Sequence, residues 1–314
     1  MAYCIGSFNL RDFNFSNTAR DNSGEIMKRD CEKIAKIIIE ENFDILALQE
    51  LNAPLPLKNL VNILNNHKNR SRAYSFSFGE NMPVQLFSRD PERYGFIWNN
   101  KRVRLLKTKR NNNPCYYSNA GAISLIRPPY YARFTTRGML GGTNFEIRIV
   151  NTHIRDATRE EERILEFNTL VKQVLPRICD LQELSEDGEF MPSYTFLMGD
   201  YNLSLNKSER SIYKIEKITP TNYTGKWRSY NTIQNMPTTL RLPNNQSFIE
   251  ECYANDYDHF TYETDLDLKL IITPQRVEPL IKYFKDSNDV ESKLKSYRTE
   301  ISDHVPIKMI VDLK

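Results

Sequence analysis

Residues 195–202 read TFLMGDYN, a mainly apolar run that leads through Gly199 into Asp200 and Asn202. A short apolar run bounded by a glycine and polar residues predicts a buried strand that ends at the edge of a sheet. Such a strand fixes the backbone from which the carboxylate and the amide project. These two side chains are therefore candidates for a functional site.

The same design recurs on both sides of this segment. The runs IGSFN (5–9), ILALQE (45–50) and IRIVNTH (147–153) end in polar side chains, and SDH (302–304) precedes the apolar VPIKMIV. Ligand sites in sheet proteins gather at strand ends, so we expect one edge to collect these groups. The polar residues concerned are Asn9, Glu50, Asn151, His153, Asp303 and His304.

Apolar runs alternate with segments of helical periodicity, which predicts a layered α/β or α+β domain. A helix over 25–42 is expected with Ser23 as its cap, and another after Thr158, which has capping-box spacing to Glu161. Weaker helical patterns cover 54–66 and 286–297. The expected strands are 3–9, 45–49, 94–98, 103–108, 122–126, 145–151, 195–199, 258–262 and 306–311.

The chain has 314 residues, of which 40% are hydrophobic, and it contains no apolar run of about 18 residues that would predict a membrane span. No internal repeat or flexible linker is present, so we expect a single domain over 1–314. The polar stretches near 205–237 and 273–299 are interpreted as insertions.

Five scattered cysteines without a CxxC pair predict neither a disulfide framework nor a structural zinc site. The N-terminal MAYCIGSFNL lacks the basic start and the apolar core of a secretory signal. Both features favour an intracellular protein, cytoplasmic or nuclear.

The formal net charge of +3 conceals a segregation of charge along the chain. Residues 101–145 contain nine basic residues and no acid, and residues 205–241 contain seven basic residues and two acids. Solvated surfaces produce such clusters often, and an anionic partner docking on one side is the alternative.

Glutamate, aspartate, asparagine and histidine together point to a particular chemistry. Oxygen ligands without cysteine select a hard ion such as Mg²⁺, with Mn²⁺ or Ca²⁺ as alternatives. Such an ion beside histidines suits attack by water on a phosphoester. A glycosidase needs paired carboxylates but not the asparagine and histidine groups, and a serine hydrolase elbow of the form GxSxG is absent.

The ordered motifs SFN, LQE, ERYGF, NTH, MGDYN, YDHF and SDHVP resemble those of the endonuclease/exonuclease/phosphatase superfamily, and most closely its deoxyribonuclease I branch. The resemblance extends from about residue 3 to residue 312. It implies a four-layer α/β/β/α sandwich of two mixed β-sheets flanked by helices, with the active site at one edge.

The resemblance also implies roles for the strand-end residues. Glu50 would be the principal metal-binding carboxylate, with Asn9 beside it and Asp303 completing the ion's surroundings. Asp200 would orient or deprotonate the attacking water, and the amide of Asn202 would bind the phosphate.

Each catalytic histidine is expected to pair with an acid, which fixes its tautomer and raises its basicity. By resemblance, Glu92 of ERYGF pairs with His153, and Asp258 of YDHF pairs with His304. Asp256 is a neighbouring rival for the second role.

Two departures from the deoxyribonuclease pattern bear on the substrate. Secreted members of that branch carry a disulfide near the second acid–histidine pair, whereas Leu205 occupies the position expected to pair with Cys252. Their basic minor-groove residue after the LQE glutamate is replaced by Leu51 and Asn52, although Arg11 keeps a basic residue near the first motif.

We interpret the two basic windows as lining one nucleic-acid groove, because aromatic and cationic side chains alternate within the second of them. DNA is the expected partner, and RNA is also compatible. The candidate substrate-binding residues are Arg11, Tyr94, Asn151, Arg133, Arg137, Lys226, Trp227 and Arg228.

Three classes of function remain open from the sequence. A metal-dependent nuclease that acts as an endonuclease is favoured. A phosphatase or phosphodiesterase acting on phospholipid head groups, inositol phosphates or nucleotides is the second class, and an inactive nucleic-acid-binding scaffold is the third.

Overall fold

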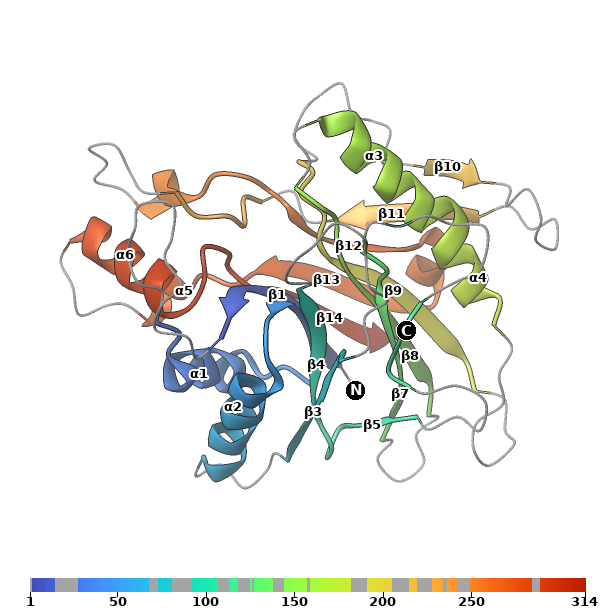
Figure 1. Ribbon diagram of the computed structural model, residues 1–314. Helices are drawn as coiled ribbons and strands as arrows, with labels where there is room; N and C mark the ends of the chain where they lie inside the picture. The colour runs from blue at the N-terminus through green and yellow to red at the C-terminus, as the bar shows by residue number, and fades with distance from the viewer. Residues whose placement is uncertain are drawn as a thin grey trace.

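The computed structural model consists of two β-sheets that pack face to face, with helices on their outer surfaces (Figure 1). This arrangement confirms the four-layer sandwich expected from the motifs. The structure describes residues 2–14, 28–67, 73–80, 92–106, 113–117, 125, 127–137, 144–156, 159–181, 191–204, 215–218, 228–233, 236–241, 249–283 and 289–314.

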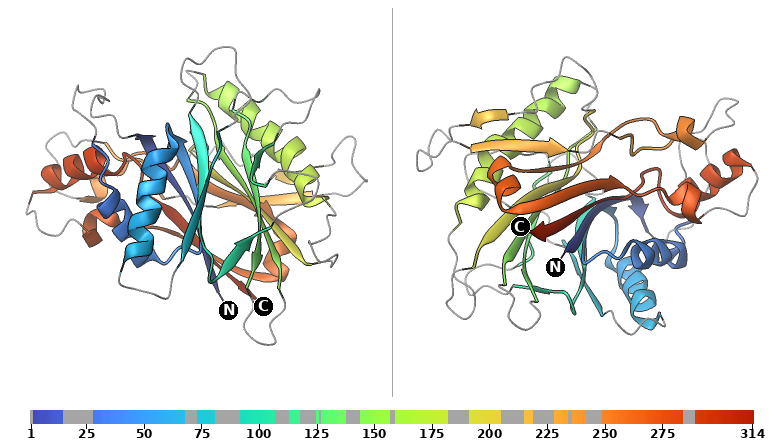
Figure 2. Two further views of the ribbon diagram at one scale, coloured as in Figure 1. Left: turned by 60° about the horizontal axis from the view of Figure 1, so that its bottom comes forward. Right: turned by 180° about the vertical axis from the view of Figure 1, so that it is seen from behind.

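The first sheet has six strands, and its strand order places the two ends of the chain together. β1 pairs in parallel with β2 and antiparallel with β14, so the first and last strands lie side by side (Figure 2). Across the sheet the strands are β13 (Leu270–Arg276), β14 (Ile307–Leu313), β1 (Tyr3–Phe13), β2 (Ile45–Leu51), β4 (Arg93–Asn99) and β3 (Tyr74–Phe78).

The second sheet has eight strands with a parallel pair, β8 and β9, at its centre. This pair has a register in which His153 lies opposite Asp200, so both residues reach the same edge. Across the sheet the strands are β10 (Ile215–Ile218), β11 (Arg228–Ile233), β12 (Asp258–Glu263), β9 (Ser193–Asp200), β8 (Glu146–His153), β7 (Tyr130–Thr136) and β5 (Val103–Leu105), and β6 (Cys115–Tyr116) also pairs with β7.

Helices cover the outer face of each sheet. The first sheet packs against α1 (Cys31–Glu41), α2 (Pro54–Asn66) and α6 (Val290–Glu300), with the short α5 (Pro279–Tyr283) beside them. The second packs against α3 (Glu160–Thr169), which continues through a π-helical turn (Leu170–Val174) into α4 (Leu175–Cys179). Two 3₁₀ turns, Ile249–Cys252 and Thr264–Leu268, complete the elements. No helix in the described part of the chain is long and apolar enough to cross a membrane.

The core between the sheets is built from large side chains that alternate along the strands. Phe96, Phe134, Phe196 and Met309 are among its members, and each is fully buried. Separate apolar clusters lie between each sheet and its helices. The five cysteines are free thiols, so packing rather than disulfide bonds holds these layers.

The predicted strands are present, and their ends differ from the sequence estimate by at most four residues. The exception is 122–126, of which the structure describes only Leu125, outside any strand. The helix expected over 25–42 begins only at Cys31, because Asp30 accepts hydrogen bonds from the backbone of Glu32 and Lys33 and so caps it. Ser23 and Thr158 lie outside the described residues. At α3 the cap position is occupied by Arg159, which makes no side-chain cap bond.

The described residues of the stretch 273–299 are part of the packed fold. They supply most of the edge strand β13 and all but the last residue of α6, whose Leu294 and Tyr297 are buried in the core. Proline is rare in strands, but Pro274 is tolerated because β13 is an edge strand, where no further strand needs its backbone N–H.

Gly199 is required where β9 passes β8. Its φ is +144°, and a Cβ built there would lie 1.8 Å from the carbonyl oxygen of Thr152. We expect Gly199→Ala to lower the free energy of unfolding by about 3 kcal/mol or more, since the backbone strain and the clash act together. Urea unfolding measures this, with Ser193→Ala at the start of the same strand as control. Equal stability of the two variants would contradict the prediction.

Candidate active site

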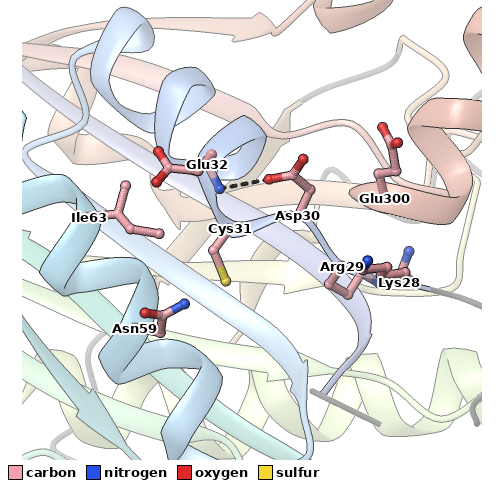
Figure 3. A pocket seen from close by; sticks show the side chains of 8 residues that line it. All are labelled: Lys28, Arg29, Asp30, Cys31, Glu32, Asn59, Ile63 and Glu300. Carbon is pink, nitrogen blue, oxygen red and sulfur yellow. Dashed lines mark hydrogen bonds between the residues drawn. The ribbon is translucent and has the colours of Figure 1, made fainter. Parts of the chain in front are cut away.

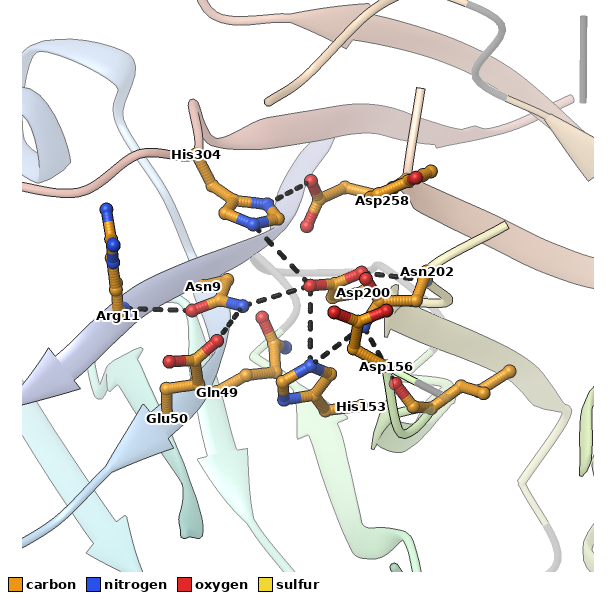
Figure 4. A network of polar contacts seen from close by, with 12 residues as sticks. Asn9, Arg11, Gln49, Glu50, His153, Asp156, Asp200, Asn202, Asp258 and His304 are labelled. Atoms are coloured by element: carbon orange, nitrogen blue, oxygen red, sulfur yellow. Dashed lines mark hydrogen bonds and ion pairs between the residues drawn. The ribbon is translucent and has the colours of Figure 1, made fainter. Parts of the chain in front are cut away.

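The polar strand ends of both sheets meet at one edge of the sandwich (Figure 4). The first sheet contributes side chains from β1 and β2 and from the segments before β4 and β14. The second contributes side chains from the ends of β8, β9 and β12. The residues brought together are Asn9, Glu50, Glu92, His153, Asp200, Asn202, Asp258, Asp303 and His304.

Asp200 is the centre of this arrangement. Its Oδ2 accepts a hydrogen bond of 3.0 Å from Asn9 Nδ2 and lies 3.5 Å from His153 Nε2 and 3.6 Å from His304 Nε2. Its Oδ1 accepts a hydrogen bond of 2.8 Å from the backbone N–H of Asn202. The carboxylate is almost fully buried, so these polar partners replace the water that it loses.

His153 is held from several directions. Its Nδ1 binds Glu92 Oε1, and Glu92 in turn forms an ion pair of 3.0 Å with Arg127. The hydroxyl of Tyr94 accepts a hydrogen bond of 3.0 Å from the His153 backbone N–H. On the other side of the ring, Nε2 lies 3.1 Å from Asn202 Nδ2. These contacts direct Nε2 toward Asp200.

His304 has an equivalent arrangement on the opposite side of Asp200. Its Nδ1 lies 2.8 Å from Asp258 Oδ2, and its backbone N–H donates to the hydroxyl of Ser302. The rival acid Asp256 binds the hydroxyl of Ser204 instead. Both proposed acid–histidine pairs are therefore present in the structure, with Asp258 as the partner of His304.

The electrostatic environment favours the protonated imidazoles. Burial alone lowers the pKa of His153, but the carboxylates of Glu92 and Asp200 outweigh it and raise this pKa to about 9. The pKa of His304 is raised well above its ordinary value in the same way, since Asp258 and Asp200 outweigh burial. Conversely, His153 and then Arg127 lower the pKa of Glu92 against the effect of its own burial.

Glu50 and its neighbours occupy strained backbone. Glu50 (φ 57°), Arg11 (φ 39°), Asp12 (φ 51°) and Asn202 (φ 49°) are left-handed although none is a glycine. Hydrogen bonds hold this geometry: Asn9 Nδ2 donates to Glu50 Oε1 at 2.7 Å, and the Asp12 N–H donates to Glu50 Oε2 at 3.2 Å. Backbone strain of this kind is typical of functional sites, where the surrounding structure compensates for it.

The donor set fits a hard divalent cation. Donor atoms of Glu50, Glu92 and His153 lie within 4.8 Å of one another. Burial, followed by the carboxylates of Glu92 and Asp303, raises the pKa of Glu50 to about 7, so the charged form of Glu50 is disfavoured in the protein alone. A bound cation would stabilise that negative charge. Asp303 is bound through Oδ2 to Arg11 Nη1 at 2.7 Å, so Arg11 already neutralises part of this charge.

Three of the basic residues assigned to a nucleic-acid groove are not at this edge, and the interpretation is corrected for them: Arg133, Arg137 and Arg228. Arg133 is buried and bound to Glu146, while Arg228 is bound to Asp180 and Glu263. Arg137 is exposed beyond the far end of β7, about 20 Å along the strand from Tyr130 at the active edge. Lys226 and Trp227 lie outside the described residues.

Two other candidate substrate-binding residues, Asn151 and Tyr94, are buried and bind other parts of the protein. Asn151 is completely buried between the sheets, where its Oδ1 accepts from Gln49 Nε2 at 2.7 Å and its Nδ2 donates to the Leu48 carbonyl at 2.9 Å. Tyr94 is also buried and holds the backbone of His153. Both therefore position the site from within the core.

Sequence reasoning missed three residues that support the site. In the sequence, Arg127 stands out only as one of the nine basic residues of 101–145, and Gln49 only as the middle residue of the LQE motif. Arg29 had no signal, because its partners are backbone carbonyl groups more than ten residues away.

No protein-family model and no curated protein sequence matches the chain. Its fold, however, is found among solved structures. A Bacteroides thetaiotaomicron protein described as an endonuclease/exonuclease/phosphatase family protein is 13% identical, with a TM-score of 0.53 over 99% of this chain and 97% of that one.

Two further structures share the fold. ANGEL2, described as a 2′,3′-cyclic phosphatase and solved with adenosine-2′,3′-vanadate, is 16% identical, with a TM-score of 0.55 over 99% of this chain and 96% of ANGEL2. TDP2 from D. rerio, solved with a single-strand DNA product, is 13% identical, with a TM-score of 0.53 over 99% of each chain. The chain therefore has the deoxyribonuclease I-like fold of the endonuclease/exonuclease/phosphatase superfamily.

We expect Glu92→Gln to lower the pKa of His153 from about 9 toward its ordinary value of about 6.5, because Glu92 is the carboxylate that raises it most. NMR titration of the imidazole measures this shift, with the exposed Glu161→Gln as control. An unchanged pKa of His153 in Glu92→Gln would contradict the assigned pairing.

The same pairing predicts a pH dependence of stability. A raised histidine pKa stabilises the folded state fully below the unfolded pKa of about 6.5, and the contribution is lost as the pH rises through about 9. Glu92→Gln should therefore be less stable than the wild type at pH 6, with the difference shrinking between pH 6.5 and 9. Urea unfolding of both proteins between pH 6 and 9 measures whether the stability difference shrinks as the pH rises.

Proposed function

We propose that the protein is a divalent-metal-dependent phosphoesterase that hydrolyses phosphodiesters by direct attack of water. One observation carries the proposal: the buried Asp200 carboxylate lies between two imidazoles, each backed by its own acid, and Asn9 links it to Glu50. Such a group can orient a water molecule while its neighbours donate to a phosphate.

The residues of the chain divide the reaction between them. Asp200 has a pKa raised by burial, which the two imidazoles partly offset, and it is placed to hold the attacking water and accept its proton. His153 and His304 carry raised pKa values, so they donate N–H groups to the phosphate oxygens or to the leaving oxygen. Asn202 adds an amide donor beside His153.

Glu50 would hold the cation, with Asn9 beside it and Asp303 completing its surroundings. A bound divalent cation would neutralise the anionic phosphate and the charge that develops on the leaving oxygen. Glu92 is a further carboxylate within reach of Glu50, but its contact with His153 assigns it to orienting that ring.

Among phosphodiesters, we propose a polynucleotide as the substrate, which makes the protein a nuclease with DNA as the first candidate. The acid-free window 101–145 supports this through Arg127, which places a guanidinium beside Glu92 and His153. Arg11 supplies a second cation at the opposite side of the site. Small phosphoesters are the second candidate class, because Arg133, Arg137 and Arg228 do not extend the cationic surface to this edge.

Turnover is tested with Mg²⁺ or Mn²⁺ and a panel of plasmid DNA, single-stranded DNA, RNA and small phosphoesters. We expect Asp200→Asn and His304→Ala each to lower kcat/KM by about 10²-fold to 10⁴-fold, because each removes a proton-transfer group. EDTA should abolish turnover and added metal should restore it.

Asp258→Asn and Asp256→Asn form a matched pair of variants. Both acids are buried and stand two residues apart, but only Asp258 binds His304. We expect a loss of activity only in Asp258→Asn, provided that both variants remain folded by circular dichroism. The absence of metal-dependent turnover on every substrate would refute the proposed activity, and turnover of small esters alone would refute the nuclease assignment.

A further inference from the structure

Arg29 is a buried cation with an unusual set of partners. It precedes α1 and is 7% exposed. Its Nε and Nη2 donate to the carbonyl oxygen of Arg11, and its Nη1 donates to the carbonyl oxygens of Arg298 and Thr299 at 2.7 and 3.0 Å. The register of β1 with β2 shifts between Asn9 and Phe13, which marks a bulge in β1 that contains Arg11 and Asp12. One guanidinium thus joins this bulge to the end of α6.

The β1 side of this connection carries the strained backbone of the site. Arg11 and Asp12 are consecutive left-handed residues, and each such conformation costs on the order of 1–3 kcal/mol. The bulge directs the Arg11 N–H to Asn9 Oδ1 and the Asp12 N–H to Glu50 Oε2. Holding the Arg11 carbonyl therefore fixes the donors that orient Glu50.

The α6 side of the connection leads to Asp303. Next to Arg29, the Asp30 N–H donates to the Glu300 carbonyl, so the end of α6 is bound at two adjacent points. The chain then passes through Ser302, whose hydroxyl donates to the Asn9 carbonyl at 2.7 Å. The following residue, Asp303, reaches back to the Arg11 side chain.

We propose that Arg29 is a positioning residue that sets the affinity of the site for its divalent cation by fixing the spacing between the segments that carry Glu50 and Asp303. The inference rests on the proposed metal-dependent function. Arg29 touches neither carboxylate and acts through the backbone of Arg11 and Asp12. Residues that orient metal ligands in this indirect way typically contribute about 10-fold to 100-fold to metal affinity.

The surroundings of Arg29 supply a matched control. Arg29 and Lys28 line the same pocket, which has a volume of about 540 Å³ and also contacts Asp30, Asn59 and Glu300 (Figure 3). Lys28 is an exposed neighbour with the same charge, and it takes no part in the bonds to the three carbonyl groups. Lys28→Met therefore removes one positive charge from this region without releasing the bulge.

Isothermal titration of Mn²⁺ into the metal-free protein measures the effect directly. We expect Arg29→Met to weaken metal binding by about 10-fold or more and Lys28→Met to change it by less than about 2-fold. Weaker metal binding by Arg29→Met would distinguish lost positioning from lost charge, because removal of a nearby positive charge by itself would strengthen cation binding. In assays, Arg29→Met should raise the metal concentration needed for half-maximal turnover and leave kcat at saturating metal close to that of the wild type.

Arg29→Lys keeps the charge but cannot reach the three carbonyl groups with a planar fork, so it should bind metal more weakly than the wild type. If Arg29→Met does not fold, the metal affinity of Arg29→Lys tests whether Arg29 acts through its bonds to the carbonyl groups. Wild-type affinity in a folded Arg29→Met or Arg29→Lys protein would overturn the inference while leaving the proposed function intact. A wild-type protein that binds no divalent cation would overturn both.

Discussion

The buried carboxylate of Asp200 is the constraint on which the site depends. A charged group at the end of a core strand is stable only where polar partners replace its water. Both sheets supply those partners, Asn9 from β1 and the two histidines from β8 and the segment before β14. The relative position of the sheets is therefore fixed at the same point at which the chemistry is proposed to occur.

The partners of Asp200 are themselves held by groups behind them. Glu92 and Asp258 orient the imidazoles, and the buried pair of Gln49 and Asn151 bridges the two sheets beneath the site. Four left-handed residues that are not glycine concentrate local strain in the same place. The hydrogen bonds hold the strained backbone in place, so the site is a rigid polar cluster on an apolar core. Such rigidity suits a reaction that depends on preorganised dipoles.

The sequence allowed the prediction of residues whose positions follow from strand ends and ordered motifs. His153, Asp200 and His304 are predictable in this way, because the polar residues that begin or end an apolar run lie at an edge of the sheet. The positions of the proposed groove residues are not predictable from the sequence. A count of charges does not say at which end of a strand Arg137 lies, or whether Arg133 faces an internal partner such as Glu146. The start of α1 and the role of Arg29 depend on distant backbone groups, which no local pattern reveals.

The position of β1 between β2 and β14 has a consequence for how the molecule is made. Ser302 binds the carbonyl of Asn9 across 293 residues of sequence, and β1 pairs with β14 along five residues. A chain emerging from the ribosome presents its first strand long before that partner exists, so β1 keeps one open edge throughout synthesis. The proposed catalytic centre is consequently a late product of folding, assembled only when the last strand closes the first sheet.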